Sequence, residues 1–123
     1  MSQKIPVLTL TVSAAGAVSA HRFVGYDGAQ VSASGGKALG VATFDAADGQ
    51  DLAVDALGTT VVETAGAIAV GDEVVSDATG LAITNPAVGG EVVAAHALDS
   101  AAGAGEFIEV LLVKSSKRRV NAI

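Results

Sequence analysis

Short apolar segments, many with alternating polar residues, follow one another along the 123-residue chain, and turn-forming residues separate them. Alternation at every second position marks a strand with one buried face, and turn signals roughly 8–12 residues apart are typical of an all-β sandwich or barrel. The pattern predicts strands at residues 7–12, 17–24, 38–44, 51–56, 59–64, 73–76, 81–84, 91–98 and 107–113. It predicts turns, which use Gly, Asp or Asn, at residues 26–28, 34–36, 47–49, 57–58, 70–72, 77–80 and 85–86. Residues 99–105 are the most helix-like, so we expect a small β-sandwich or β-barrel with at most one short helix.

The chain is rich in small apolar residues and poor in aromatic ones. Half of it is hydrophobic, with three Phe, one Tyr and no Trp. Because aromatic residues supply much of the apolar area in small cores, a monomer gains less from burial, and oligomerisation is the usual remedy. We expect a single β domain over residues 1–113 and a basic tail at 114–123. The longest uncharged stretch, 5–20, is too short and too polar to span a bilayer, so no membrane partner is expected.

Charge is unevenly distributed along the chain. The formal net charge is −6, but residues 1–113 contain all 13 acidic residues and three of the seven basic ones, a balance of −10. The other four basic residues are Lys114, Lys117, Arg118 and Arg119. Four cations beside an acidic body make a weak footprint for phosphate contacts, so nucleic acid is not an expected partner.

The residues needed for catalysis or metal binding are scarce. The chain has no cysteine, and its only imidazoles are His21 and His96, which we interpret as hydrogen-bonded strand histidines. Asp45, Asp48 and Asp51 have the close spacing of a calcium loop, but they do not match the EF-hand pattern, and turn chemistry explains them more simply. No phosphate-binding glycine motif occurs either. We therefore predict no catalytic residue, no cofactor and no metal site.

Several segments resemble, in order and spacing, the phage head decoration or capsid cement proteins. These segments are residues 40–50, 58–63, 67–80 and 97–112. The chain departs from the family pattern at Gln50, where Glu is common, and at His96, which precedes Ala97 where Gly-Val-Ala-Leu is common, so that the Gly of that turn is missing. The tail from Lys114 also extends past the usual end of the family pattern.

The resemblance implies a structural protein of the virion, made in the host cytoplasm and bound to the outer surface of the capsid. There it would stabilise contacts between major capsid subunits. The implied partners are the major capsid protein and further copies of this chain, as a homotrimer or, alternatively, a dimer.

Two segments are candidates for the capsid or protomer contact. Residues 1–12 alternate in character, and Ile5, Val7, Leu8 and Leu10 would contribute to a strand added to the capsid or to a neighbouring protomer. An ordinary first strand of the domain explains the same pattern equally well. The basic tail, with Lys114, Lys117, Arg118 and Arg119, is the second candidate, either docking on an acidic capsid surface in a salt-dependent manner or remaining solvated.

Two alternatives from other functional classes remain. Residues 69–74 contain a Gly-Asp-x-Val turn like that of biotinyl- or lipoyl-carrier modules, but Lys37, the only mid-chain lysine, lacks the Met-Lys-Met context of an attachment site. A secreted glycan-binding β domain is the other, and the shortage of aromatic residues argues against it. A covalent adduct in a mass spectrum or a glycan-array signal would favour one of these alternatives.

Overall fold

The computed structural model describes residues 4–87 and 89–114, and this part of the chain consists of β-strands, turns and loops, without a helix. The strands are β1 (Pro6–Ser13), β2 (Phe23–Val24), β3 (Gly40–Ala42), β4 (Asp51–Ala65), β5 (Glu73–Ser76), β6 (Ala82–Thr84), β7 (Ala95–Ala97) and β8 (Ala104–Leu112). The all-β prediction is therefore confirmed. Within the described ranges, no helix is long and apolar enough to cross a membrane.

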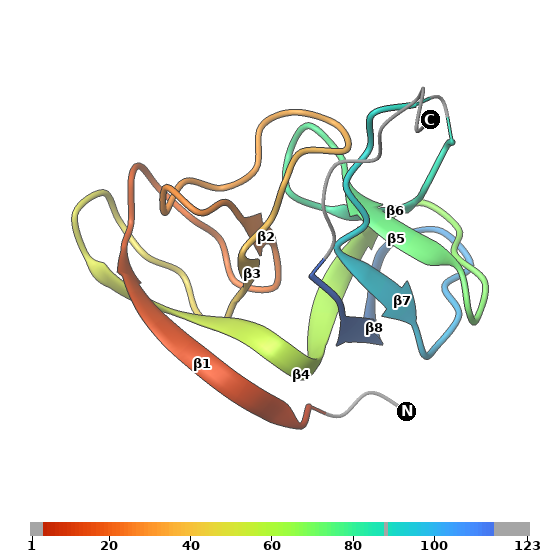
Figure 1. The fold of residues 1–123 in the computed structure, drawn as a ribbon, viewed down its shortest axis with the longest axis horizontal. Coiled ribbons are helices and arrows are strands. Elements are labelled where there is room, and N and C mark those ends of the chain that lie inside the picture. The colour runs from red at the N-terminus through yellow and green to blue at the C-terminus, as the bar shows by residue number, and fades with distance from the viewer. Residues whose placement is uncertain (1–3, 88, 115–123) are drawn as a thin grey trace, which may run out of the picture.

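Five strands close into a barrel. β4 pairs with β8 on one side and with β6 on the other, and β5 and β7 complete the circuit from β6 to β8. The β4–β6 pair is parallel, through Thr64 and Ala82, whereas the other four pairs are antiparallel. We call this part, which includes β4 from residue 59 onward, the barrel; it lies on the right in Figure 1.

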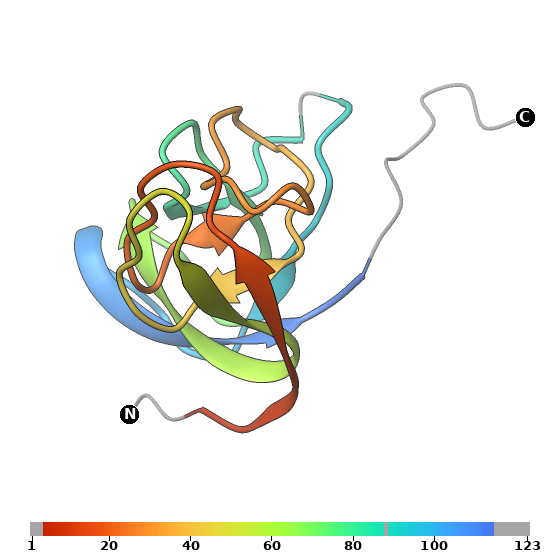
Figure 2. The same cartoon turned by 90° about the vertical axis from the view of Figure 1, so that its left-hand side faces the viewer.

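The first part of β4 belongs to a second group of strands. Residues 51–58 pair with β1, residues 54–55 also pair with β3, and β3 pairs with β2. We call these strands, with residues 51–58 of β4, the flank. Figures 1 and 2 show β1 running beside β4, which curves from the flank into the barrel. β4 is thus common to both parts.

Two hydrophobic cores lie on opposite sides of β2 and β3. Successive strand residues point to opposite faces, and here Phe23 enters the barrel core while Val24 enters the flank core. Val41 and Ala42 divide in the same way. Phe23 is fully buried, a burial that contributes about 1.5–3 kcal/mol. The short strands β2 and β3 therefore form a wall between the cores.

The predicted strand at residues 17–24 is wrong except for its last two residues. His21 has a positive φ of 65°, which breaks an extended run. Val18 makes only an isolated bridge with Ala46, and the next two backbone donors bond to side chains: Ser19 N–H to Gln30 Oε1 and Ala20 N–H to Asp45 Oδ1. His21 is therefore a loop residue.

The predicted turn at residues 57–58 is also wrong, because the expected strands 51–56 and 59–64 are one continuous strand, β4. Gly58 has a φ of 95°, and a side chain here would collide with the backbone of Ile5 and Val7. Glycine is therefore needed here because it lacks a side chain, which lets two backbones approach closely within a strand. It does not reverse the chain.

Other predicted boundaries shift by several residues. The strand expected at 38–44 is limited to β3, and the one at 91–98 is limited to β7. The helix-like residues 99–105 form no helix: Ala101 makes an isolated bridge with Ile68, and β8 begins at Ala104. The two glycines in that stretch favour a turn over a helix.

Candidate partner-binding surface

The two histidines occupy separate structural positions. His21 Nδ1 lies 3.2 Å from the Val61 carbonyl oxygen, and its ring meets Phe107 edge-on at 5.2 Å between centroids. His96 lies in β7, as predicted, opposite Glu73 and Leu111. Within residues 4–87 and 89–114, no group of three or more His, Cys, Asp or Glu side chains is placed to hold a metal ion.

The regularly spaced aspartates tie loops together. Asp45 Oδ1 accepts a hydrogen bond from Ala20 N–H at 2.7 Å, and Asp48 Oδ1 accepts one from Gly16 N–H at 3.0 Å. Asp51 is the first residue of β4. The first two carboxylates thus accept hydrogen bonds from backbone donors of the loop between β1 and β2 and tie that loop to residues 45–48.

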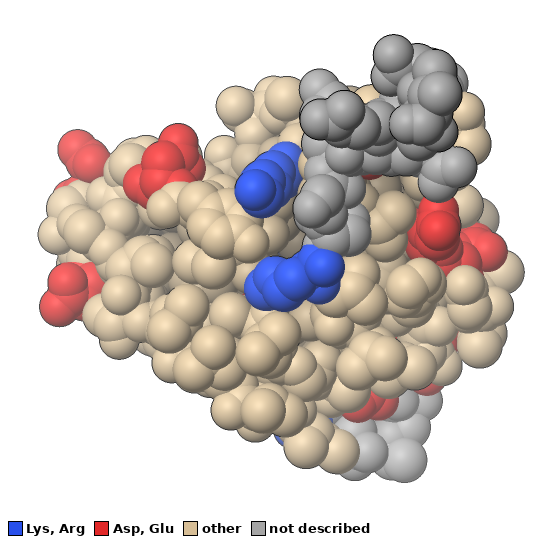
Figure 3. Space-filling model, viewed as in Figure 1, with Lys and Arg blue, Asp and Glu red and all other residues tan. Residues whose placement is uncertain are grey.

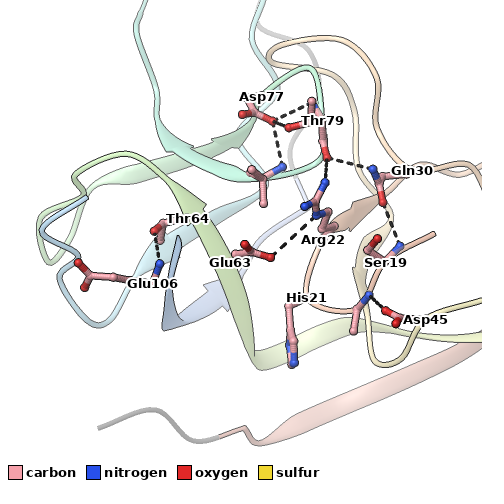
Figure 4. A network of polar contacts seen from close by, with 12 residues as sticks. Ser19, His21, Arg22, Gln30, Asp45, Glu63, Thr64, Asp77, Thr79 and Glu106 are labelled. Atoms are coloured by element: carbon pink, nitrogen blue, oxygen red, sulfur yellow. Dashed lines mark hydrogen bonds and ion pairs between the residues drawn. The ribbon is translucent and has the colours of Figure 1, made fainter. Parts of the chain in front are cut away.

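A polar network joins the flank loops to the barrel (Figure 4). Arg22 Nη1 and Gln30 Nε2 donate to the Thr79 carbonyl oxygen at 3.2 and 3.0 Å, and Gln30 Oε1 accepts from Ser19 N–H. Arg22 Nε lies 4.0 Å from Glu63 Oε1 on β4. These polar groups bond to one another across the junction, so the network positions loops.

A shallow hollow of about 180 Å³ opens beside this network. Its lining residues are Gly25, Asp27, Ala29, Gln30, Val31, Ser32, Ala33 and Lys37. Pockets for small-molecule ligands usually measure about 300–1,000 Å³. The hollow has room for a single side chain of a partner.

The N-terminal strand presents an apolar surface. Ile5, Val7 and Leu8 are 58%, 76% and 40% exposed, and Leu57, which pairs with Leu8 in register, is exposed beside them. We call these four residues the edge patch. Leu10, predicted as a contact residue with them, instead packs partly buried against the flank core.

The edge patch is held by a buried carboxylate that the sequence analysis missed. Asp55 is only 1% exposed, and Lys4 Nζ lies 2.9 Å from its Oδ2. Thr9 and Thr60 each donate a hydroxyl hydrogen bond to the same carboxylate at 2.9 Å. A single Asp within the otherwise apolar run 52–57 was the available signal, since a buried charge needs partners.

Two hydrogen bonds between Ile5 and Thr59 also hold the N-terminal segment in place. Ile5 N–H donates to Thr59 Oγ1 at 2.8 Å, and Thr59 N–H donates to the Ile5 carbonyl oxygen at 3.0 Å. Together with the absence of a side chain at Gly58, these bonds bring the N-terminal segment against β4. These contacts therefore fix the position of the edge patch relative to β4.

Only the first residue of the predicted basic tail lies in the described part of the chain. Lys114 Nζ donates to the Leu39 carbonyl oxygen at 2.7 Å, and desolvation lowers the pKa of this amine from its ordinary value. Lys117, Arg118 and Arg119 lie outside the described residues. The tail thus starts from a defined point on the surface.

Two comparisons with known proteins give matches. A family model described as phage cement protein matches residues 1–112. The crystal structure of the head fiber gp8.5 N base in bacteriophage phi29 has a TM-score of 0.70 at 20% sequence identity, covering 91% of this chain and 98% of that one. At this identity the likeness shows a shared fold. No curated protein matches the chain.

Proposed function

Because this chain belongs to the phage cement protein family, we propose that it binds the outer surface of a phage head and stabilises contacts between major capsid subunits. Family membership itself makes the chain a structural protein associated with the phage capsid, and it argues against an enzyme. The outer surface, the capsid subunits as direct partners and the mode of contact are the proposed part.

The exposed edge of β1 is the observation that supports this contact most directly. In the described part of the chain β1 pairs only with β4, so its other edge has no strand beside it. Soluble proteins usually protect such edges with charged residues or proline. Residues 7–13 contain neither, and the edge patch adds exposed apolar side chains. An edge of this kind is suited to pairing with a strand of a partner.

We also propose that the protein acts as a homotrimer, with a dimer as the alternative. Small cores gain stability from oligomerisation, and several copies engaging one shell turn modest single contacts into high avidity. The partner strand at β1 then comes from the capsid or from a neighbouring protomer. The same substitution distinguishes these two, as described next.

Val7→Lys tests the proposed contact, and Val70→Lys is its matched control. Val7 is 76% exposed on β1 and Val70 is 66% exposed in the turn before β5 on the barrel, so both changes place the same charge on an exposed site. Burying an unpaired charge in an interface costs several kcal/mol, so we expect capsid occupancy to fall at least about 10-fold with Val7→Lys. Val70→Lys should leave occupancy unchanged.

Occupancy is measured by electron microscopy of heads lacking the protein after incubation with each variant, and the oligomeric state by analytical ultracentrifugation. A change of oligomeric state with Val7→Lys assigns β1 to the contact between protomers. Equal occupancy for both folded variants would contradict a role for β1. Failure of the unmodified protein to bind heads or to raise their thermal stability would contradict the proposed function itself.

A further inference from the structure

Four cationic side chains lie in the described part of the chain, and they divide into two pairs. Lys4 has Asp55 as its partner, and Arg22 has Glu63. Lys37 and Lys114 form no ion pair within the described residues. Both residues are exposed, although the Lys114 ammonium is partly desolvated where it bonds to Leu39.

Lys37 is held by an aromatic ring instead of an acid. Its Nζ lies 5.0 Å from the centroid of the Tyr26 ring, and Tyr26 is itself 54% exposed. A cation over an exposed ring gains only about 0.5–1 kcal/mol and keeps its charge. Lys37 also lines the 180 Å³ hollow beside residues 25–33. Lys37 and Tyr26 therefore place a positive charge next to the hollow, which has room for one side chain.

Lys114 belongs to the same side of the molecule. Its ammonium bonds to the carbonyl of Leu39, two residues along the chain from Lys37. Figure 3 shows two groups of basic side chains close together where the described chain ends, with acidic side chains toward the two ends of this face. We call Tyr26, Lys37 and Lys114 the basic face.

The rest of the sequence strengthens this charge separation. Lys117, Arg118 and Arg119 follow Lys114 within five residues, a contour length of at most about 18 Å. Four of the seven basic residues thus lie at positions 114–119 of the sequence, while all 13 acidic residues precede residue 114. Such an asymmetry orients a charged partner as it approaches, because only one side of the protein attracts it.

We propose that the basic face docks on an acidic protein surface, with one carboxylate side chain of the partner beside Lys37 at the rim of the hollow. Assigning that surface to the capsid rests on the proposed function. A protein fits better than a nucleic acid, because single strands are usually held by several stacking aromatics, and this face has one ring, already covered by an ammonium.

The first test uses a polyglutamate peptide and NMR, and is independent of any capsid. We expect chemical-shift changes concentrated at Tyr26, Lys37 and Lys114, and lost between about 0.1 and 1 M salt as the Debye length falls from about 10 to 3 Å. Absence of shifts, or shifts spread over the barrel, would overturn the proposal. Stronger binding to single-stranded DNA of equal charge would indicate a nucleic-acid partner instead and would also overturn it.

The second test compares Lys37→Gln with Ser100→Glu, an exposed position in the loop between β7 and β8. Both changes lower the net charge by one, so a general charge effect alters both alike. We expect Lys37→Gln to weaken polyglutamate and capsid binding about two- to fivefold, as for one rim charge, and Ser100→Glu to have no specific effect. Equal effects of the two variants on polyglutamate binding would refute the basic face. Loss of capsid binding with both, while only Lys37→Gln loses the peptide, would count against the capsid as partner and not against the face.

Discussion

The barrel and the flank solve the problem of strand edges in opposite ways. In the barrel, each of the five strands has a neighbour on both sides, so no backbone edge is left for another chain. In the flank, the sheet ends at β1, whose outer edge is uncharged from residue 7 to 13 and carries the edge patch. The barrel therefore leaves no free strand edge, and the flank provides a surface suited to recognition.

Core substitutions should show how far the two parts depend on each other. Phe23→Ala removes the largest fully buried side chain, which belongs to the barrel core but stands in the wall between the cores, and should cost about 3–5 kcal/mol. Leu52→Ala in the flank core should cost about 2–4 kcal/mol. Denaturant unfolding monitored by circular dichroism measures both losses.

Hydrogen exchange then separates a global effect from a local one. With Phe23→Ala, amides of both parts should lose protection, whereas with Leu52→Ala the loss should be larger in β1 and β3 than in β7 and β8. An equal loss of amide protection in both parts with Leu52→Ala would mean that the flank does not open independently of the barrel. The two parts would then differ in their surfaces but not in their stability.

Gly58→Ala attacks the junction between the two parts. The new side chain meets a φ of 95° and the backbone of Ile5 and Val7, so we expect a loss of about 1–3 kcal/mol. Faster exchange of the Ile5 and Thr59 amides is the measurement, because these two residues bond to each other across the junction. Gly49→Ala is the control: it has a similar positive φ of 83° but open space around it, so only backbone strain remains.

Lys4→Met should have the smallest of these effects on stability. It leaves the Asp55 carboxylate with two hydroxyl donors, and because Lys4 is partly exposed we expect a loss of about 1–2 kcal/mol. Lys37→Met, which removes an ammonium without an acidic partner in the described chain, should change stability by about 0.5 kcal/mol or less. Equal melting temperatures for these two variants would show that the Asp55 pair does not anchor the N-terminal segment.

The sequence pattern predicted a strand correctly where the strand is short and turn residues directly before and after it set its bounds. β5 is confirmed at its exact bounds, because a Gly-Asp turn precedes it and an Asp-x-x-Gly turn follows it. Prediction failed where a long-range contact sets the conformation. Gly58 reads as a turn residue until the backbone of Ile5 lies against it, and the parallel pairing of Thr64 with Ala82 has no local signal.

The exposed apolar surface of β1 was partly predictable, because it too depends on local alternation. Alternation in residues 5–10 indicated exposed apolar residues, and Ile5, Val7 and Leu8 are exposed, while Leu10 faces the flank core. From the sequence, Lys37 was considered only as the attachment site of a biotinyl- or lipoyl-carrier module. Its position near Lys114 depends on the fold, because 77 residues separate them in the sequence.

The continuity of β4 also determines how the protein would respond to a pull. A pull on β1 along its length would be resisted in shear by the antiparallel ladder between β1 and β4, with several hydrogen bonds stretched together rather than one at a time. Because the same backbone continues past Gly58 into the barrel, the tension passes along the covalent backbone of β4 and from there through hydrogen bonds to β8 and β6. A force applied to β1 is therefore shared by the whole barrel, because β4 connects the two.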